Sequence, residues 1–197
     1  MLKLTDNPPI LTPDVESLTD LDGTWWVAYT KTHFEKSFAW DLYSRGIGYF
    51  LPMCEYVIFS SGRNRRGMKL LFPSYVFFCG SNEDRHTALT TNRLLQVIDV
   101  ADQLGLISQL MTIEKGLSCE AGFEPYPYRP IGTRTRIISG PMMDTEGVVI
   151  ERKNEKARMV LEVTTLGQGA VMEIEADLLE PIHSPGAHPL KPTPTYS

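Results

Sequence analysis

The side chains that could act as nucleophiles or metal ligands are few in this sequence and lie far apart. Three cysteines, Cys54, Cys79 and Cys119, and four histidines are spread over 197 residues. None of them falls into the short paired spacings that structural zinc sites use. Two of the histidines, His183 and His188, lie in a proline-bearing C-terminal segment. The spacing therefore predicts neither a metal centre nor a bound cofactor.

Glycine-containing motifs that would indicate catalysis are also missing from the sequence. It holds no phosphate-cradling GxxxxGK and no nucleophile-elbow GxSxG. The run Gly-Gln-Gly at residues 167–169 lacks the third glycine and the following helix of a dinucleotide site, so we interpret it as a turn. An enzyme is the class of protein that the sequence favours least.

The cysteines and the apolar runs bear on the compartment. An odd number of well-separated cysteines in apolar or mixed settings is typical of buried thiols in a reducing environment. Residues 1–22 are acidic and carry three prolines, unlike a signal peptide. The longest apolar stretch, residues 70–79, is interrupted by Pro73 and Ser74 and is about half as long as a membrane span. We expect a cytoplasmic protein without a membrane span.

Charge is distributed unevenly along the chain. The net charge is -5, and it divides into -4 for residues 1–22, +2 for residues 23–118, -4 for residues 119–182 and +1 for the remainder. A weakly basic first part beside an acidic second part leaves no broad cationic surface. Any contact with nucleic acid should therefore be local.

The elements that must position functional side chains begin near residue 23. Residues 25–30 are aromatic and β-branched, which predicts a strand. Thr32 and Glu35 have the spacing of a capping box, which indicates a helix start. Phe34, Phe38 and Leu42 then recur every four residues, so we predict a helix over residues 34–45.

The next segments continue an α+β pattern. Residues 49–59 and 68–79 are β-rich and are joined by a polar, basic segment at residues 60–67, which we interpret as a hairpin tip. A capped helix to residue 90, a strand at residues 94–100 and a helix from residue 104 follow. Helices packed against one antiparallel sheet would bury these apolar stripes.

The pattern changes after residue 118. Residues 119–131 are rich in proline and predict a linker. Short strands are predicted at residues 134–138, 147–152, 158–164 and 170–175, which together indicate a small all-β barrel. The expected divisions are a disordered leader (1–22), a first domain (23–118), the linker (119–131), a barrel domain (132–182) and a disordered tail (183–197).

Two passages resemble the transcription elongation factors of the NusG type. The first reads WWVAYTK at residues 25–31 and is followed by LFPSYVF at residues 71–77. The second reads GTRTRIISGPMMDTEGVV at residues 132–149 and resembles the KOW motif that opens the C-terminal barrel of those factors. Together with the predicted β-α-β-β order, the two passages extend the resemblance over nearly everything from residue 23 to residue 182. The short length is more similar to the specialised RfaH and UpxY types.

The resemblance implies a fold, a function and partners. The fold is a NusG N-terminal-like α+β domain followed by an SH3-like KOW barrel. The function is that of a non-enzymatic, monomeric factor that binds RNA polymerase and modulates pausing, termination or antitermination. In the family, the Leu-Phe-Pro-x-Tyr-x-Phe segment docks on the clamp helices of the β′ subunit. The implied polymerase-binding residues are Phe72, Pro73, Tyr75 and Phe77.

Other positions imply further contacts. Ser74 stands where the family usually has glycine. Leu166 stands where housekeeping factors usually carry an aromatic that engages Rho or a ribosomal protein, so it is the implied partner-binding residue of the KOW barrel. His86 and Thr87 resemble a segment of RfaH-like proteins that lies near the gate loop of the polymerase β subunit. Regions that face the non-template DNA strand in RfaH-like proteins match His33, Lys36 and Arg93.

Basic residues gather at the predicted hairpin tip, where they could reach phosphates of DNA in the transcription bubble. The alternative is a solvated tip, which is the commoner outcome for charged loops. The residues we predict to contact nucleic acid are His33, Lys36, Arg63, Arg65, Arg66 and Arg93.

Strand alternation predicts that Tyr75, Phe77 and Cys79 share one face of the sheet, and that Val76 and Phe78 share the other. We expect helices to cover one face and the other to stay open for the polymerase. The alternative is that helices cover both faces.

A second function stays open from the sequence, namely an RNA-binding or ribosome-associated KOW module. The acidic second part of the chain disfavours it. An RfaH-like refolding of the barrel into helices is disfavoured by its β-branched strands and glycines.

Overall fold

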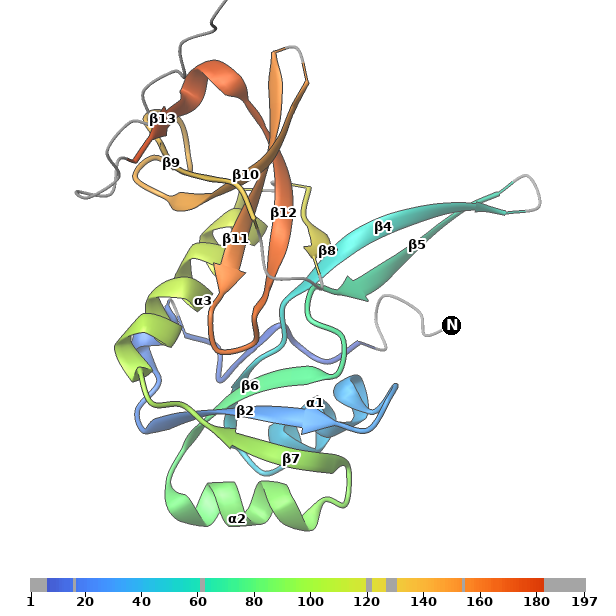
Figure 1. The fold of residues 1–197 in the computed structure, drawn as a ribbon. Helices are drawn as coiled ribbons and strands as arrows, with labels where there is room; N and C mark the ends of the chain where they lie inside the picture. The colour runs from blue at the N-terminus through green and yellow to red at the C-terminus, as the bar shows by residue number, and fades with distance from the viewer. Residues whose placement is uncertain are drawn as a thin grey trace, which may run out of the picture.

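The computed structural model describes residues 7–15, 17–60, 63–119, 122–126, 131–153 and 155–182, with the backbone alone at residues 58–60 and 63–65. The N-terminal part contains β1 (Leu11–Thr12), the 3-10 helix η2 (Leu18–Asp20), β2 (Thr24–Thr30), α1 (Glu35–Ser44), β3 (Gly48–Phe50), β4 (Met53–Ser60), β5 (Arg63–Leu70), β6 (Tyr75–Gly80), α2 (Asn82–Thr90), β7 (Leu94–Asp99) and α3 (Gln103–Ser118). The C-terminal part contains β8 (Glu124–Tyr126), β9 (Thr133–Ile137), β10 (Glu146–Lys153), β11 (Lys156–Val163), β12 (Gln168–Glu175), the 3-10 helix η3 (Ala176–Leu178) and β13 (Leu179–Pro181). The predicted α+β class is confirmed (Figure 1).

A central antiparallel sheet organises the N-terminal part, in the strand order β1-β3-β6-β2-β7. Val27 of β2 lies opposite Phe77 of β6 and Ile98 of β7. Successive residues of β2 point to opposite faces, so Trp25 and Trp26 belong to two different cores.

Helices α1 and α2 cover the face of the sheet that carries Trp26. This core contains Phe78 from β6, Phe38 and Leu42 from α1 and Ala88 from α2, all buried. The rings of Trp26 and Phe78 lie 5.4 Å apart. Each fully buried large apolar side chain contributes about 1.5–3 kcal/mol. The periodicity that predicted α1 therefore describes its inner face correctly.

The opposite face, which carries Trp25, Val27 and Phe77, is also covered. One continuous buried cluster joins these residues to α3 and to strands of the C-terminal part, where its members include Leu161. Figure 1 shows α3 running from the sheet up to β11. The prediction that this face stays open is wrong, and the cover consists of α3 together with strands of the C-terminal part, not of helices alone.

The leader differs from the disordered segment that we predicted. Within its described residues, β1 pairs with β3, and Leu51 N–H donates to the carbonyl of Ile10 at 2.6 Å. Leu18 is fully buried in the cluster that also contains Leu110 and Ile113 of α3. The leader therefore extends the sheet and contributes to the cover of its second face.

The six strands of the C-terminal part form one antiparallel sheet in the order β13-β9-β10-β11-β12-β8. We call this part the C-terminal β domain. Met159, Leu161 and Val163 of β11 are buried, and so is Val160 between them. β8 lies inside the predicted linker and pairs with β12, with Pro125 opposite Ala170. The predicted tail, residues 183–197, lies outside the described residues.

Helix α3 joins the two parts of the molecule. Its first residue, Gln103, accepts a hydrogen bond from Trp25 N–H at 2.8 Å and donates one to Trp25 O at 2.9 Å, which fastens the helix to β2. Near its other end, a Cβ added at Gly116 would lie 2.3 Å from Cζ of Phe123. Glycine therefore allows the ring that precedes β8 to pack directly on the helix backbone.

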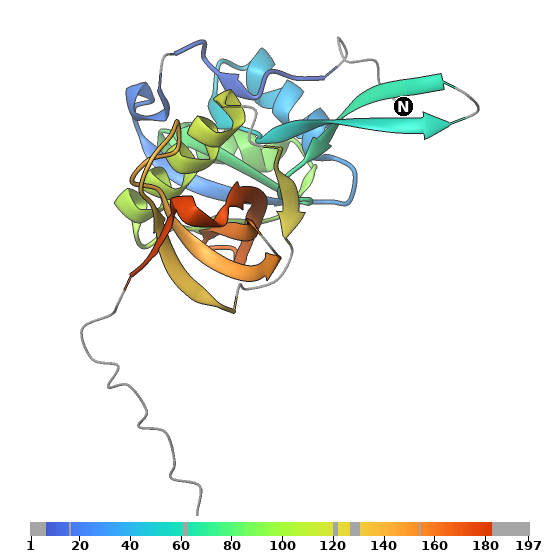
Figure 2. The same ribbon diagram turned by 90° about the horizontal axis from the view of Figure 1, so that it is seen from above.

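Strands β4 and β5 form a separate two-stranded sheet that projects from the body of the molecule, as Figures 1 and 2 both show. The strands run to Ser60 and from Arg63, so the predicted tip at residues 60–67 is mostly strand. Cross-strand pairing supplies the backbone hydrogen bonds that a polar composition would otherwise send to water.

Candidate functional site

The turn that connects β5 to β6 is defined by four residues, from Phe72 to Tyr75. Tyr75 N–H donates to the carbonyl of Phe72 at 3.1 Å, which closes a β-turn. Pro73 occupies the second position and is exposed, while Ser74 occupies the third with φ of 70°. This pattern is that of a type II turn, in which glycine is preferred at the third position. We call residues 72–75 the Pro-Ser turn.

The four implied polymerase-binding residues are brought together at this turn but differ in exposure. Phe72 and Phe77 are buried, at 1% and 0% exposed, with their rings in an edge-to-face contact at 5.7 Å. Tyr75 is partly exposed and stacks on Tyr29 of β2 at 5.2 Å. Pro73 and Tyr75 therefore form an accessible rim, and the two phenylalanines lie beneath the cover of the second sheet face.

The tyrosine rim is not an acid–base device. Burial, followed by the neighbouring Tyr29, raises the pKa of Tyr75 above its ordinary value, so its hydroxyl stays neutral near pH 7. A neutral phenol with an apolar ring suits a protein surface that is dry at its centre and wet at its edge.

The residues predicted to contact nucleic acid are only partly brought together. Lys36 is partly buried and donates to Asn7 Oδ1 at 2.6 Å and to Met68 O at 2.9 Å. Burial lowers its pKa despite the opposing effect of Glu35. Lys36 thus ties the leader and β5 to α1.

Arg93 and His33 lie at the end of the sheet where β2 stops. The guanidinium of Arg93 pairs with Asp41 and lies 5.4 Å from the centre of the Phe34 ring. His33 is exposed and adopts a positive φ of 67°. Arg66 is exposed on β5, whereas the side chains of Arg63 and Arg65 lie outside the described residues.

Leu166, the implied partner-binding residue of the C-terminal β domain, lies in the turn between β11 and β12. Its backbone N–H donates to Val163 O at 3.0 Å. Its side chain is partly buried and packs against the buried cluster beneath the second sheet face, to which the sheet, α3 and the C-terminal β domain all contribute. We call this cluster the shared cluster. In this arrangement Leu166 lies at the contact between the two parts of the molecule.

One residue of the site was given a different role by sequence reasoning. Glu35 was assigned to a capping box with Thr32, but the N-cap of α1 is Phe34 and makes no side-chain capping bond. Instead the Glu35 carboxylate accepts the backbone N–H of Ser74 at 2.8 Å. Because Ser74 lies 39 residues from Glu35, no local sequence pattern predicts this hydrogen bond. The sequence signal that was available is Ser74 itself, which stands where the family usually has glycine.

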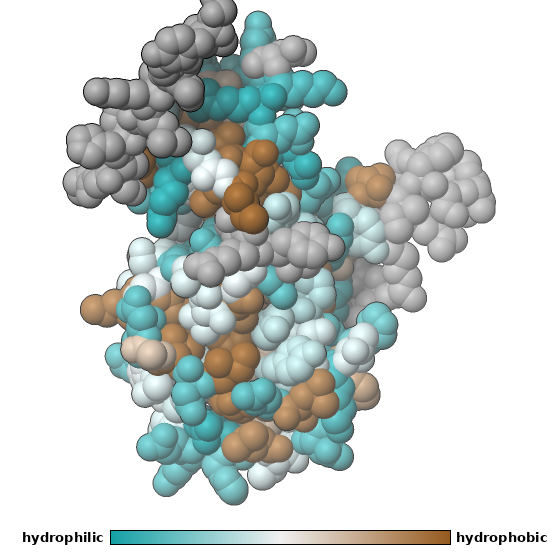
Figure 3. Space-filling model, viewed as in Figure 1, coloured by the Kyte–Doolittle hydropathy of each residue, from teal (hydrophilic) through white to brown (hydrophobic). Residues whose placement is uncertain are grey.

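Among the described residues, no group of three or more His, Cys, Asp or Glu side chains could hold a metal ion. None of the described helices is long and apolar enough to cross a membrane. The face in Figure 3 carries its apolar side chains in small separate groups.

Three comparisons bear on the family. The family model described as "Transcription termination factor nusG" matches residues 23–114. The transcription termination/antitermination protein NusG of Pseudomonas aeruginosa is 28% identical over 175 residues, which cover 80% of this chain and 98% of that protein.

Among solved structures, one described as "Domain interaction in Thermotoga maritima NusG" superposes with a TM-score of 0.50 at 18% identity, covering 82% of this chain and 98% of the other. This likeness supports the same fold across both parts of the molecule. Residues 23–114 thus match the family model of NusG, and most of the chain is similar in sequence to a curated NusG protein and in fold to a solved one.

Proposed function

We propose that this protein is a transcription elongation factor that binds RNA polymerase through the Pro-Ser turn and strand β6, and acts by binding rather than by catalysis. The observation that supports this most directly is the arrangement at the turn. Exposed Pro73 and partly exposed Tyr75 adjoin the buried aromatic pair Phe72 and Phe77. An apolar rim over an aromatic cluster suits the side of a helix pair, such as the polymerase β′ clamp helices. Such a factor works in the cytoplasm.

The structure represents a closed arrangement of this surface. Phe77 shares one buried cluster with Ile113 of α3 and Met159 of β11. A partner can therefore reach Pro73 and Tyr75 directly, but reaches Phe77 only when the covering elements move. If the open state is rare, the measured affinity falls in proportion to its population, tenfold for each 1.4 kcal/mol of opening free energy.

Bound to the polymerase, the factor would change pausing or termination only through a difference in affinity between polymerase states. A factor that prefers the elongating state over the paused state by about 1.4 kcal/mol shifts their ratio about tenfold. DNA contacts through His33, Arg66 and Arg93 would add affinity that depends on salt. Lys36 is a weaker candidate because it already contacts Asn7 and Met68.

A contact of Leu166 with Rho or a ribosomal protein belongs to the same proposal. Leu166 packs on the shared cluster, so this contact requires separation of the C-terminal β domain from the sheet. Polymerase binding and exposure of Leu166 would then be coupled, because both need the same opening.

The test uses purified polymerase on a paused template. The double variant Pro73→Ala and Tyr75→Ser should bind polymerase at least about tenfold more weakly and lose its effect on the pause. Tyr43→Ser is the matched control, because Tyr43 is 49% exposed on α1, across the sheet from the proposed surface. Equal binding by the wild type and the double variant would overturn the assignment of this surface.

A further inference from the structure

We propose that Glu35 is the positioning residue of the polymerase-binding surface: its buried carboxylate holds Ser74 in the left-handed conformation, so that Pro73 and Tyr75 are presented in one fixed arrangement. This inference rests on the proposed function and adds a residue that the polymerase does not touch. Glu35 is only 5% exposed.

The Pro-Ser turn needs such support because of its third residue. A type II turn places the third residue at positive φ, which glycine adopts freely and which costs conformational energy for a residue with a Cβ. Ser74 has φ of 70°. Without an external partner, the Ser74 backbone would be free to return to negative φ, and the ring of Tyr75 would turn away from Tyr29.

Both polar groups of the Ser74 backbone are held from outside the turn. Its N–H donates to Glu35 Oε1 at 2.8 Å. Its carbonyl accepts from the backbone N–H of Thr30 at 2.8 Å and from Thr30 Oγ1 at 3.2 Å. Thr30 is fully buried at the end of β2. The orientation of this peptide is thus fixed by β2 on one side and by α1 on the other.

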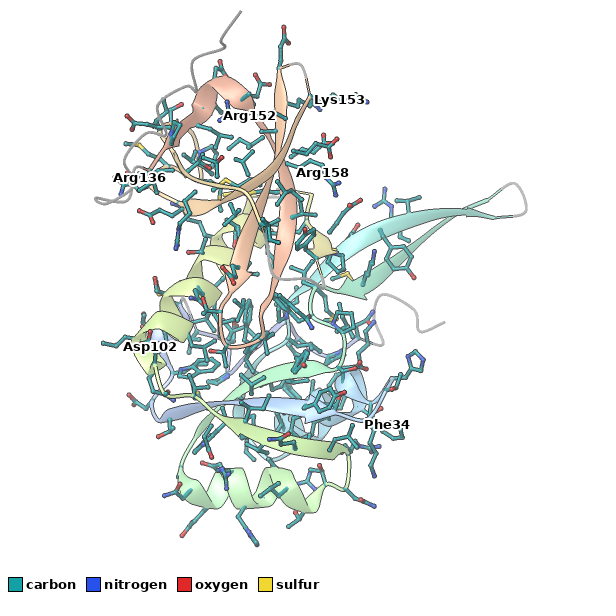
Figure 4. The ribbon with its side chains drawn as sticks, in the orientation of Figure 1. Phe34, Asp102, Arg136, Arg152, Lys153 and Arg158 are labelled. Carbon is teal, nitrogen blue, oxygen red and sulfur yellow. The ribbon has the colours of Figure 1, made fainter. Side chains whose placement is uncertain are left out.

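The local sequence explains how Glu35 becomes available. His33 has φ of 67°, so the chain cannot be helical there, and the N-cap of α1 is Phe34 instead of Thr32. A carboxylate in the first turn is favoured by the helix dipole, which lowers the cost of its burial. Figure 4 shows Phe34 at the end of the sheet where β2 gives way to α1.

The geometry makes a double-variant experiment decisive. Glu35→Ala removes the acceptor, and Glu35→Gln keeps a carbonyl oxygen that can accept the same bond. Ser74→Gly lets the turn adopt positive φ without support. We expect polymerase affinity to fall about tenfold for Glu35→Ala and to stay within about twofold of wild type for Glu35→Gln. Adding Ser74→Gly to Glu35→Ala should restore the affinity.

The control and the opposing outcomes separate this inference from the proposed function. Glu83 is an exposed carboxylate in the first turn of α2, and the control variant Glu83→Ala should leave polymerase binding unchanged. If wild type binds and Glu35→Ala binds equally, the positioning role is wrong. If Ser74→Gly fails to rescue Glu35→Ala, Glu35 supports only the general fold and the inference is overturned. If wild type itself does not bind polymerase, the proposed function falls, and this inference with it.

Discussion

Gln109 and Thr164 exchange two hydrogen bonds across the contact between α3 and the C-terminal β domain. Gln109 Nε2 donates to Thr164 Oγ1 at 2.9 Å, and Thr164 N–H donates to Gln109 Oε1 at 2.9 Å. A reciprocal pair of this kind fixes both distance and orientation. It links the covering helix to the turn that carries Leu166.

Gln109→Ala should weaken the closed arrangement and raise polymerase affinity. Loss of two exposed hydrogen bonds should lower the free energy of unfolding by about 1–2 kcal/mol, and the same loss should favour the open state. Titration of polymerase with the variant, with Gln96→Ala on β7 as the control, checks the expected gain of severalfold. A variant that is destabilised but binds no better would show that cover and binding are uncoupled.

Leu18→Ala should destabilise the protein although it lies outside the segment that the family model matches. Leu18 is fully buried between the sheet and α3, and a buried Leu→Ala change costs about 2–5 kcal/mol. Thr19→Ala, at an exposed neighbour, should cost far less. Urea unfolding of both variants measures the difference. Equal midpoints would mean that the leader does not belong to the core.

The raised pKa of Cys79 should lower the free energy of unfolding at alkaline pH. Burial raises the pKa of the Cys79 thiol from 9.0 to about 12, with smaller contributions from Asp22 and Asp84. The folded state therefore keeps its proton where the unfolded state loses it, so this stabilisation is full below pH 9 and is lost as pH rises towards 12. Each pH unit in that window removes up to about 1.4 kcal/mol.

Unfolding in urea at pH 8, 9 and 10 would test this prediction. The free energy of unfolding should fall less steeply with pH for Cys79→Ala than for wild type. Identical slopes would contradict it.

Cys119, which is exposed, should react with iodoacetamide in the folded protein, whereas Cys79 should react only after unfolding.

The sequence predicted the elements whose pattern is local. The aromatic and β-branched composition of residues 25–30 predicted β2, and the four-residue repeat of Phe38 and Leu42 predicted α1, each within a single segment. The predicted capped helix before residue 90 is α2, and its N-cap is Ser81, which exchanges hydrogen bonds with Asp84 three residues away.

The features that sequence reasoning missed depend on distant partners. Alternation placed Phe77 on the correct face, but the cover of that face includes residues from Leu18 to Leu179. The leader contains β1 because that segment pairs with β3. A segment rich in proline gives no local signal for such a pairing. The spacing of Thr32 and Glu35 predicted a capping box, but the positive φ of His33 prevents it. The Glu35 carboxylate accepts the backbone N–H of Ser74 instead.

The shared cluster also has a consequence for how the protein is made and handled. Its contacts span almost the whole chain, so the aromatic face of β2 and β6 cannot be shielded until the last strands have left the ribosome. Until then the nascent chain presents Trp25, Phe50 and Phe77 to its surroundings, and this kind of surface promotes aggregation. A shortened protein that ends at residue 114 would keep the leader and most of α3 over that face but would lose the cover from the C-terminal β domain, so it should aggregate more readily than the full chain.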